Sequence, residues 1–205
     1  MPDRRHIFPT LDYELPLWKS NITRIAGIDE AGRGAWAGPV CAAVVILRPG
    51  LDLALQLQGV RDSKLMTPLA REYWTPRIQA VALGWGVAFA SASEIDSLGI
   101  LPATKLAATR AMLTLDPQYL ITDYLLFPGL DLPQSALVKG DQVSLSVAAA
   151  SVLAKTARDT WMRELDGRIY GYQFSRHKGY GTHLHRLAIE HLGFSSEHRR
   201  SFNIH

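Results

Sequence analysis

GIDEAGRGAWAGPV, residues 27–40, is the stretch that decides the fold of this sequence. The apolar segment at 25–28 leads into it and predicts a short strand, and a second apolar run at 40–47 predicts another. Gly32-Arg33-Gly34 breaks the backbone between them. We therefore predict two strands joined by a special turn, with two adjacent acids, Asp29 and Glu30, at the end of the first.

Outward from this stretch, predicted strands alternate with predicted helices. Further strands are expected at 85–91, 119–122 and 137–138, and helices at 67–80, 102–114 and 144–166. In the last of these helices the apolar side chains that share one face are Leu153, Ala157, Trp161 and Leu165. The alternation predicts an α/β protein. Residues 1–21 are expected to form a loosely held N-terminal extension, and residues 22–205 one domain.

Composition narrows the class of protein. A chain of 205 residues with 47% hydrophobic and 20% charged residues has enough apolar material for one domain with a substantial core, unlike a disordered chain. The first twenty residues lack the apolar run of a signal peptide, and no run reaches the length of a membrane span. The single cysteine, Cys41, excludes an internal disulfide and favours a cytoplasmic location.

Charge is unevenly spread along the chain. The formal net charge is only +3, but residues 155–200 hold nine Lys or Arg against five Asp or Glu, together with five histidines. This quarter of the chain is suited to facing a polyanion such as a nucleic acid. A mixed-charge helix surface in contact with solvent has the same composition, so both interpretations stand.

The acids suggest a metal site. Asp29 and Glu30 repel each other, and a divalent cation reverses that cost, because Mg²⁺ prefers carboxylate oxygens. Asp123 and Asp141 follow strand-like segments, whose ends gather ligand-binding groups in α/β proteins. Four carboxylates are therefore candidates to converge. An acidic pair at a turn is more often plain surface decoration, and these residues alone do not exclude that alternative.

The motifs together resemble the ribonuclease HII family. The matching segments run in the family's order from residue 22 to 203 and comprise GIDEAGRGAWAGPV (27–40), DSK (62–64), ITD (121–123), KGD (139–141), AAASVLAK (148–155), RD (158–159), HKGYGT (177–182) and HRRSF (198–202). The resemblance implies a ribonuclease H-like fold, with a central mixed sheet flanked by helices and a helical C-terminal part. One departure is Leu65-Met66, which stands where a second lysine commonly follows the DSK lysine.

The resemblance also implies a chemistry. It places the family's catalytic, metal-binding carboxylates on Asp29, Glu30, Asp123 and Asp141, with two ions of Mg²⁺ or Mn²⁺ expected when substrate is bound. The implied reaction is hydrolysis of the RNA strand of RNA/DNA hybrids and incision 5′ of single ribonucleotides in duplex DNA, leaving 5′-phosphate and 3′-hydroxyl ends. Such an enzyme removes ribonucleotides from DNA.

Substrate recognition is expected at two loops. Glycines let the backbone approach a ligand, so the peptide groups of Gly32-Arg33-Gly34 are suited to bonding a 2′-hydroxyl, the group that distinguishes RNA from DNA. The resemblance implies this role and places Tyr180 against the sugar of the next, deoxyribose nucleotide. A surface aromatic in a Gly-Tyr-Gly turn is the alternative. Arg33, Lys64 and Lys178 are candidates for phosphate contacts, or else solvated cations.

Other constellations favour plain structural roles. Asp159 is expected to form an ion pair within or against its helix rather than bind metal. His177, His183 and His185 are weak evidence for zinc, because their segment holds no cysteine and His183 and His185 are only two residues apart. No long N-terminal domain like that of ribonuclease HIII is expected, which favours ribonuclease HII. Nothing in the sequence demands a partner chain, so a monomer is expected. Two rival functions remain: a metal nuclease acting on DNA, and a non-catalytic nucleic-acid-binding protein.

Overall fold

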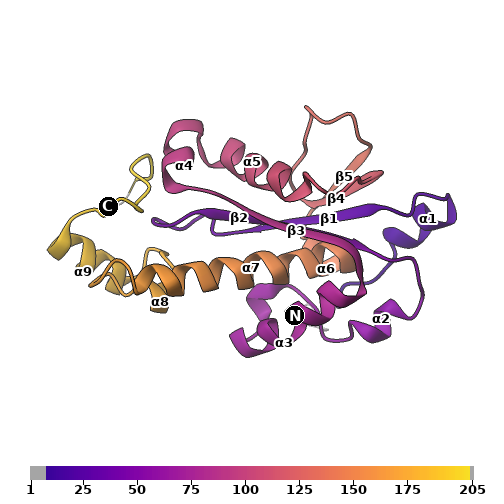
Figure 1. Cartoon of the computed structure of the whole chain (residues 1–205), viewed down its shortest axis with the longest axis horizontal. Coiled ribbons are helices and arrows are strands. Elements are labelled where there is room, and N and C mark those ends of the chain that lie inside the picture. The colour runs from indigo at the N-terminus through magenta and orange to yellow at the C-terminus, as the bar shows by residue number, and fades with distance from the viewer. Residues whose placement is uncertain (1–7, 204–205) are drawn as a thin grey trace, which may run out of the picture.

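A five-stranded mixed sheet lies at the centre of the computed structural model, which describes residues 8–203 (Figure 1). The strands are β1 (Ile25–Ala31), β2 (Val40–Leu47), β3 (Ala82–Ala90), β4 (Tyr119–Asp123) and β5 (Gln134–Leu137), and their order is β3-β2-β1-β4-β5. β1, β2 and β3 are antiparallel neighbours, whereas β4 pairs parallel to β1 and β5 parallel to β4. The predicted strand-turn-strand at residues 25–47 is the β1–β2 pair.

Helices cover both faces of the sheet. β2 reads VCAAVVIL and every residue in it is buried, as expected for a strand with both faces covered. One face packs against α7 (Leu145–Asp166), with α3 (Pro68–Val81) beyond it. The other packs against α5 (Ile100–Met112), which α4 (Ala92–Leu98) precedes. The central mixed sheet flanked by helices is confirmed.

α7 approaches β1 closely because small residues line the contact. A Cβ at Gly27 would lie only 2.3 Å from the backbone carbon of Ser146, so only glycine fits there. Alanines at 148–150 continue the contact, and all three are fully buried. The start of α7 is thereby held against β1 two residues before Asp29.

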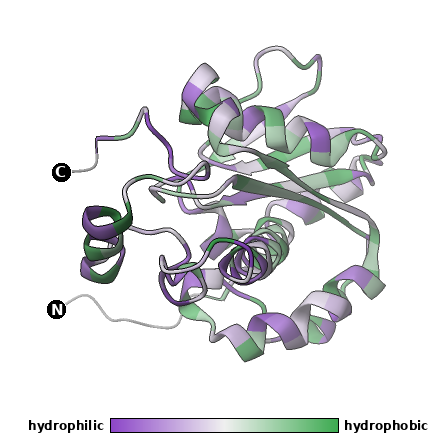
Figure 2. Cartoon of the chain, turned by 60° about the vertical axis from the view of Figure 1, so that its left-hand side comes forward, coloured by the Kyte–Doolittle hydropathy of each residue, from purple (hydrophilic) through white to green (hydrophobic). Residues whose placement is uncertain are grey.

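Short elements complete the chain. They are α1 (Glu14–Lys19), α2 (Leu53–Gln56), the 3₁₀ helix η1 (Ser63–Leu65), α6 (Gly140–Val143), α8 (Phe174–His177) and α9 (His183–Leu192). α8, α9 and the C-terminal end of α7 form a helical part beyond the sheet, with its own small core around Met162, Leu165 and Phe174. Figure 2 shows α9 standing apart from the sheet and its covering helices.

The predicted elements are confirmed with shifted ends. The strand expected at 85–91 begins earlier, at Ala82, and the one expected at 137–138 is Gln134–Leu137. The helix expected at 102–114 runs from Ile100 to Met112, since Pro102 is tolerated in a first turn. Among residues 8–203 no helix has the length and apolar character needed to cross a membrane.

The expectation of a loosely held N-terminal extension is wrong for residues 10–19. The backbone N–H of Thr10 donates to Val143 at 3.2 Å, and Thr10 accepts from the N–H of Leu145 at 2.8 Å. Glu14 is fully buried, and its Oε1 accepts from Ser144 Oγ at 2.6 Å and from Ser146 N at 3.0 Å. This segment therefore packs on the start of α7. Residues 1–7 lie outside the described part of the chain.

Candidate active site

The parallel pairing of β1 with β4 brings two of the predicted acids together. The register aligns Ile28 with Thr122, so Asp29 and Asp123, the next residues of the two strands, lie side by side at the end of the sheet. Asp29 is 4% exposed, and its Oδ1 accepts the N–H of Glu30 at 2.7 Å. Asp123 is half-buried. This arrangement is the convergence at strand ends that the sequence predicts.

Asp141 reaches the same place from a tight turn. Gly140 donates its N–H to Asp123 Oδ1 at 2.8 Å, which fixes the start of α6 directly over the end of β4. Lys139, with a φ of 58°, adopts the left-handed conformation that lets the chain turn there. Asp141 follows in the first turn of α6 and is 3% exposed.

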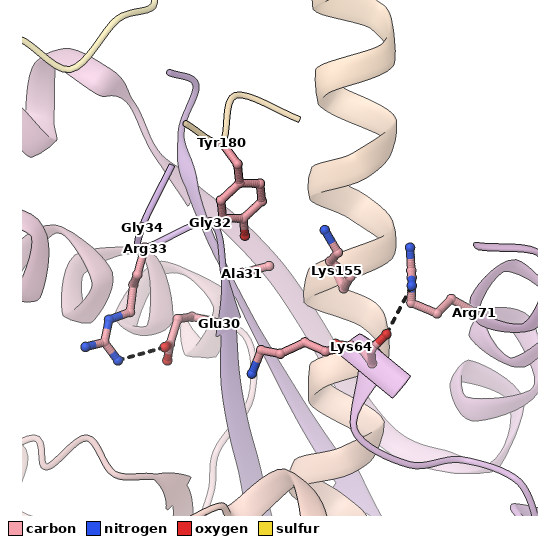
Figure 3. Close-up of a pocket in the computed structure, with 10 residues that line it drawn as sticks. Glu30, Ala31, Gly32, Arg33, Gly34, Lys64, Arg71, Lys155 and Tyr180 are labelled. Atoms are coloured by element: carbon pink, nitrogen blue, oxygen red, sulfur yellow. Dashed lines mark hydrogen bonds and ion pairs between the residues drawn. The ribbon is translucent and has the colours of Figure 1, made fainter. Parts of the chain in front are cut away.

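Glu30 differs from the other three acids. Successive side chains of a strand point to opposite faces, so Glu30 points away from the face that Asp29 shares with α7. Its Oε1 accepts from Arg33 Nη1 at 3.0 Å, a contact that Figure 3 shows within the turn after β1. The four carboxylates therefore belong to one cluster, but Glu30 joins it from the other side of the strand.

The acids raise one another's pKa. The pKa of Asp29 lies well above its ordinary value, chiefly because of burial and then because of the charges of Glu30, Asp123 and Asp141. Burial also raises the pKa of Glu30, although Arg33 opposes the shift. Burial, followed by the neighbouring Asp62, raises the pKa of Asp141 to about 6. Without a counter-charge, the ionised cluster is unfavourable.

Lys64 supplies one such counter-charge. Its side chain is largely exposed, yet its Nζ lies 3.6 Å from Asp141 Oδ2. Burial lowers the pKa of Lys64, but the charges of Asp29, Asp62 and Asp141 outweigh that effect and raise it overall. Asp62 fixes the lysine backbone by accepting the N–H of Lys64 at 2.9 Å. In Figure 3 the Lys64 side chain extends toward β1 and Glu30.

The oxygen atoms of the four carboxylates are chemically suited to bind a hard divalent cation. Each carboxylate offers the oxygen ligands that Mg²⁺ and Mn²⁺ take, and a cation would relieve the repulsion that raises the pKa values. Within residues 8–203, however, no three His, Cys, Asp or Glu side chains are already spaced to hold a metal ion. The metal set Asp29, Glu30, Asp123 and Asp141 therefore stays a prediction.

A cavity of about 650 Å³ opens beside the acids. Its lining residues are Glu30, Ala31, Gly32, Arg33, Gly34, Ser63, Lys64, Arg71, Lys155 and Tyr180 (Figure 3). The structure thus brings together the glycine loop, Tyr180, two of the three predicted phosphate-binding cations and one predicted catalytic acid. Lys178 is the exception: it does not line the cavity, and its Nζ donates to the carbonyl oxygen of Ser175.

Two charged residues of the cavity were missed by the sequence analysis. Lys155, on α7, has its Nζ 5.5 Å from the centre of the Tyr180 ring and 2.8 Å from Asp159 Oδ1. Arg71, on α3, lies 2.9 Å from Asp159 Oδ2 and donates to the carbonyl oxygen of Ser63 at 3.0 Å. The ion pair expected of Asp159 is confirmed, with these two partners. The spacing of Lys155 and Asp159 by four residues was the available signal, whereas Arg71 had none.

Three histidines, His177, His185 and His198, are buried and pack against one another. The rings of His177 and His185 stack with centres 4.3 Å apart, and Nε2 of His185 lies 3.1 Å from Nε2 of His198. His177 accepts the N–H of Gly179 at 3.2 Å, and Nδ1 of His185 lies 3.0 Å from the carbonyl oxygen of Tyr180. These contacts support the Tyr180 loop. His183 is exposed and takes no part.

Solved structures place this fold among the ribonuclease H-like nucleases. The RNase HII of a PCNA:RNase HII complex from Archaeoglobus fulgidus is similar, with a TM-score of 0.72 and 26% identity over 86% of this chain and 92% of that one. A Bst-RNase HIII in complex with Mn²⁺ shares the fold, with a TM-score of 0.65 and 18% identity over 88% of this chain and 67% of that one.

The sequence comparisons narrow this class. The model of the ribonuclease HII family matches residues 26–205. Ribonuclease HII of Synechococcus sp. is 50% identical over 195 residues, which are 95% of this chain and 88% of that protein. The chain belongs to the ribonuclease HII family and is an endoribonuclease of the ribonuclease H class.

Proposed function

We propose that the protein hydrolyses the RNA strand of RNA/DNA hybrids and incises 5′ of single ribonucleotides embedded in duplex DNA. The observation that carries this proposal is the shared cavity, in which the glycine loop and Tyr180 stand beside Glu30, one acid of the carboxylate cluster. Backbone groups at residues 32–34 are suited to a 2′-hydroxyl, and the Tyr180 ring to the adjacent deoxyribose. A monomer is part of this proposal.

Asp29, Glu30, Asp123 and Asp141 would hold Mg²⁺ or Mn²⁺. The metal's contribution, when bound, is to activate water and to stabilise the leaving 3′ oxygen. The Mn²⁺ in the RNase HIII neighbour supports this assignment by analogy of fold alone. The chain's own residues position the substrate: Lys64, Arg33 and Lys155 place positive charge along the cavity, where phosphates bind without regard to base sequence. Lys178, which is turned to Ser175, remains a weaker candidate for such a contact.

The test compares three duplexes of identical sequence: all DNA, DNA with one ribonucleotide, and an RNA/DNA hybrid. Each is incubated with Mg²⁺, with Mn²⁺ and with EDTA, and the products are mapped on a sequencing gel. We expect cleavage of the second and third duplexes only, 5′ of the ribonucleotide, and none with EDTA. Equal cleavage of the all-DNA duplex would instead identify a DNA nuclease, and binding without cleavage a non-catalytic protein.

A further inference from the structure

Two arginines are buried without a carboxylate partner. Arg158 and Arg199 are both fully buried, and in the part of the chain that the structure describes neither lies within 4.0 Å of an acidic oxygen. A buried guanidinium without an ion pair is costly, so it must be held by other polar groups. Backbone carbonyl oxygens accept from all three nitrogens of the Arg158 guanidinium but from only two of Arg199, whose Nη2 has no hydrogen-bond partner among the described residues.

Arg158 bonds to two loops at once. Its Nε donates to the carbonyl oxygen of Pro39 at 2.9 Å and its Nη2 to that of Ala37 at 3.1 Å. Both acceptors lie in residues 32–39, the loop that begins with Gly32-Arg33-Gly34 and is called the glycine loop from here on. Its Nη1 donates to the carbonyl oxygen of Lys178 at 3.0 Å, in the tyrosine loop, here residues 178–181. One rigid, planar group on α7 therefore joins the two proposed sugar-binding elements.

The surrounding contacts follow the same pattern. The N–H groups of Trp36 and Ala37 point to the carbonyl oxygen of Gly179, at 2.8 and 3.3 Å. The Arg158 guanidinium carbon lies 5.4 Å from the centre of the Tyr180 ring, and a Cβ at Gly32 would lie 1.8 Å from Arg158 Nε. Arg158 is thus packed between Gly32 on one side and Tyr180 on the other.

Arg199 provides an internal contrast. Its Nε donates to the carbonyl oxygen of Gly38 and its Nη1 to that of Arg33, each at 2.9 Å. Both acceptors belong to the glycine loop. Among the described residues Arg199 makes no hydrogen bond to the tyrosine loop, so it braces one sugar-binding element where Arg158 braces two.

We propose that Arg158 is a positioning residue that sets the placement of Tyr180 relative to the glycine loop, and thereby the preference for an RNA-to-DNA junction. The proposal rests on the proposed function. A continuous hybrid offers a ribose at every position and depends mainly on the glycine loop. A single ribonucleotide presents one ribose followed by a deoxyribose, so both loops must engage at a fixed spacing, where small misplacements are costly.

The test is the ratio of kcat/KM for the one-ribonucleotide duplex to kcat/KM for the hybrid. Lysine cannot reproduce three bonds in fixed directions, so Arg158→Lys is expected to lower this ratio about 10-fold or more. Arg199→Lys is expected to lower both rates together and leave the ratio within about 2-fold, because its contacts lie in the glycine loop only. Arg163→Lys, an exposed arginine on the same helix, is the matched control.

A double-mutant cycle separates positioning from mere stability. If Arg158 acts through Tyr180, then Arg158→Lys adds little further loss of preference in a Tyr180→Ala background. Arg158→Gln, which removes the charge but keeps a donor, provides a second variant, and all are assayed below their measured Tm. Equal loss on both substrates, full additivity with Tyr180→Ala, or failure of both Arg158 variants to fold would overturn the proposal. If the parent enzyme itself cuts neither substrate, the proposed function fails instead.

Discussion

Glu30 of the carboxylate cluster lines the same cavity as the two loops that we propose bind the sugars, but the cluster and the loops are held by opposite means. In the cluster, acids on β1, β4 and α6 crowd together and raise one another's pKa, with Lys64 and Arg33 as partial counter-charges. In the loops, neutral carbonyl oxygens in fixed directions accept from the buried guanidinium groups, from all three nitrogens of Arg158 and from two of the three of Arg199. The first region is electrostatically strained, and the second is geometrically fixed.

This difference separates two tasks. A cluster whose charges repel gains stability when a cation arrives, so its strain favours metal binding. A loop that must distinguish one hydroxyl group gains nothing from strain and needs a constant shape. The two regions should therefore respond in opposite ways to substitution: loss of charge in the cluster stabilises the metal-free protein, whereas loss of fit in the loops destabilises it.

The largest expected effect follows from Asp29→Asn. We expect kcat on the one-ribonucleotide duplex to fall by roughly 1,000-fold or more, because the substitution removes a carboxylate that we propose as a metal ligand. The metal-free protein should become more stable by roughly 0.5–2 kcal/mol at pH 8, because burial and neighbouring acids disfavour the Asp29 charge, whereas Asn keeps an oxygen for the Glu30 N–H. Steady-state kinetics and urea denaturation measure the two effects.

The pH dependence of the stability gained by Asp29→Asn tests the cause of that gain. Since the pKa of Asp29 is raised in the folded state, the penalty is present at high pH and disappears as the carboxyl becomes protonated, so the gain should shrink toward pH 4. Asp131→Asn replaces an exposed acid in the loop between β4 and β5 and should change neither kcat nor the stability of the metal-free protein. Parent-like activity of Asp29→Asn would exclude Asp29 as a metal ligand.

A somewhat smaller effect is expected in the loops, from Gly32→Ala. Gly32 has a φ of 93°, and its new methyl group would lie 1.8 Å from Arg158 Nε. We expect the free energy of unfolding to fall by roughly 2–4 kcal/mol, from backbone strain and overpacking together. Gly34→Ala is the control within the same loop, because nothing lies within 4 Å of its Cβ, and its stability should stay within about 0.5 kcal/mol of the parent. Equal stability of the two variants would contradict the close packing of Arg158 on Gly32.

Much of the fold was predictable because its signals are local. The apolar runs at 25–28 and 40–47 mark β1 and β2, and the positions of Asp29, Asp123 and Asp141 after strand-like segments predicted that these acids would gather. The roles of the buried arginines were not predictable, because arginines in a basic segment look alike whether solvated or buried. Two of the nine cations counted at 155–200, Arg158 and Arg199, contact carbonyls rather than a polyanion.

The N-terminal segment is a second feature that local sequence patterns did not predict. Glu14 looks like a solvated acid, and its partners Ser144 and Ser146 lie 130 residues or more along the chain. No local pattern connects them, so the segment was expected to be loose. Its packing on the start of α7 depends on tertiary contacts, which a single sequence does not reveal.

The smallest expected effect concerns the histidines behind the tyrosine loop. Burial, reinforced by the neighbouring His177, lowers the pKa of His185 to about 4, and burial likewise lowers that of His198 to about 4. At these two histidines the unfolded chain therefore binds more protons than the folded protein between pH 4 and about 6.5, and their contribution to stability falls as the pH decreases through that window. The expected loss between pH 7 and pH 5 is about 2 kcal/mol per histidine. Because the raised pKa values of Asp29, Glu30 and Asp141 act in the opposite direction, the effect is isolated by comparing variants. His185→Gln should lose less stability than the parent over this range, whereas His183→Gln, on the same helix but exposed, should behave like the parent. An unchanged pH dependence in His185→Gln would show that the tyrosine loop is not held by a buried neutral histidine.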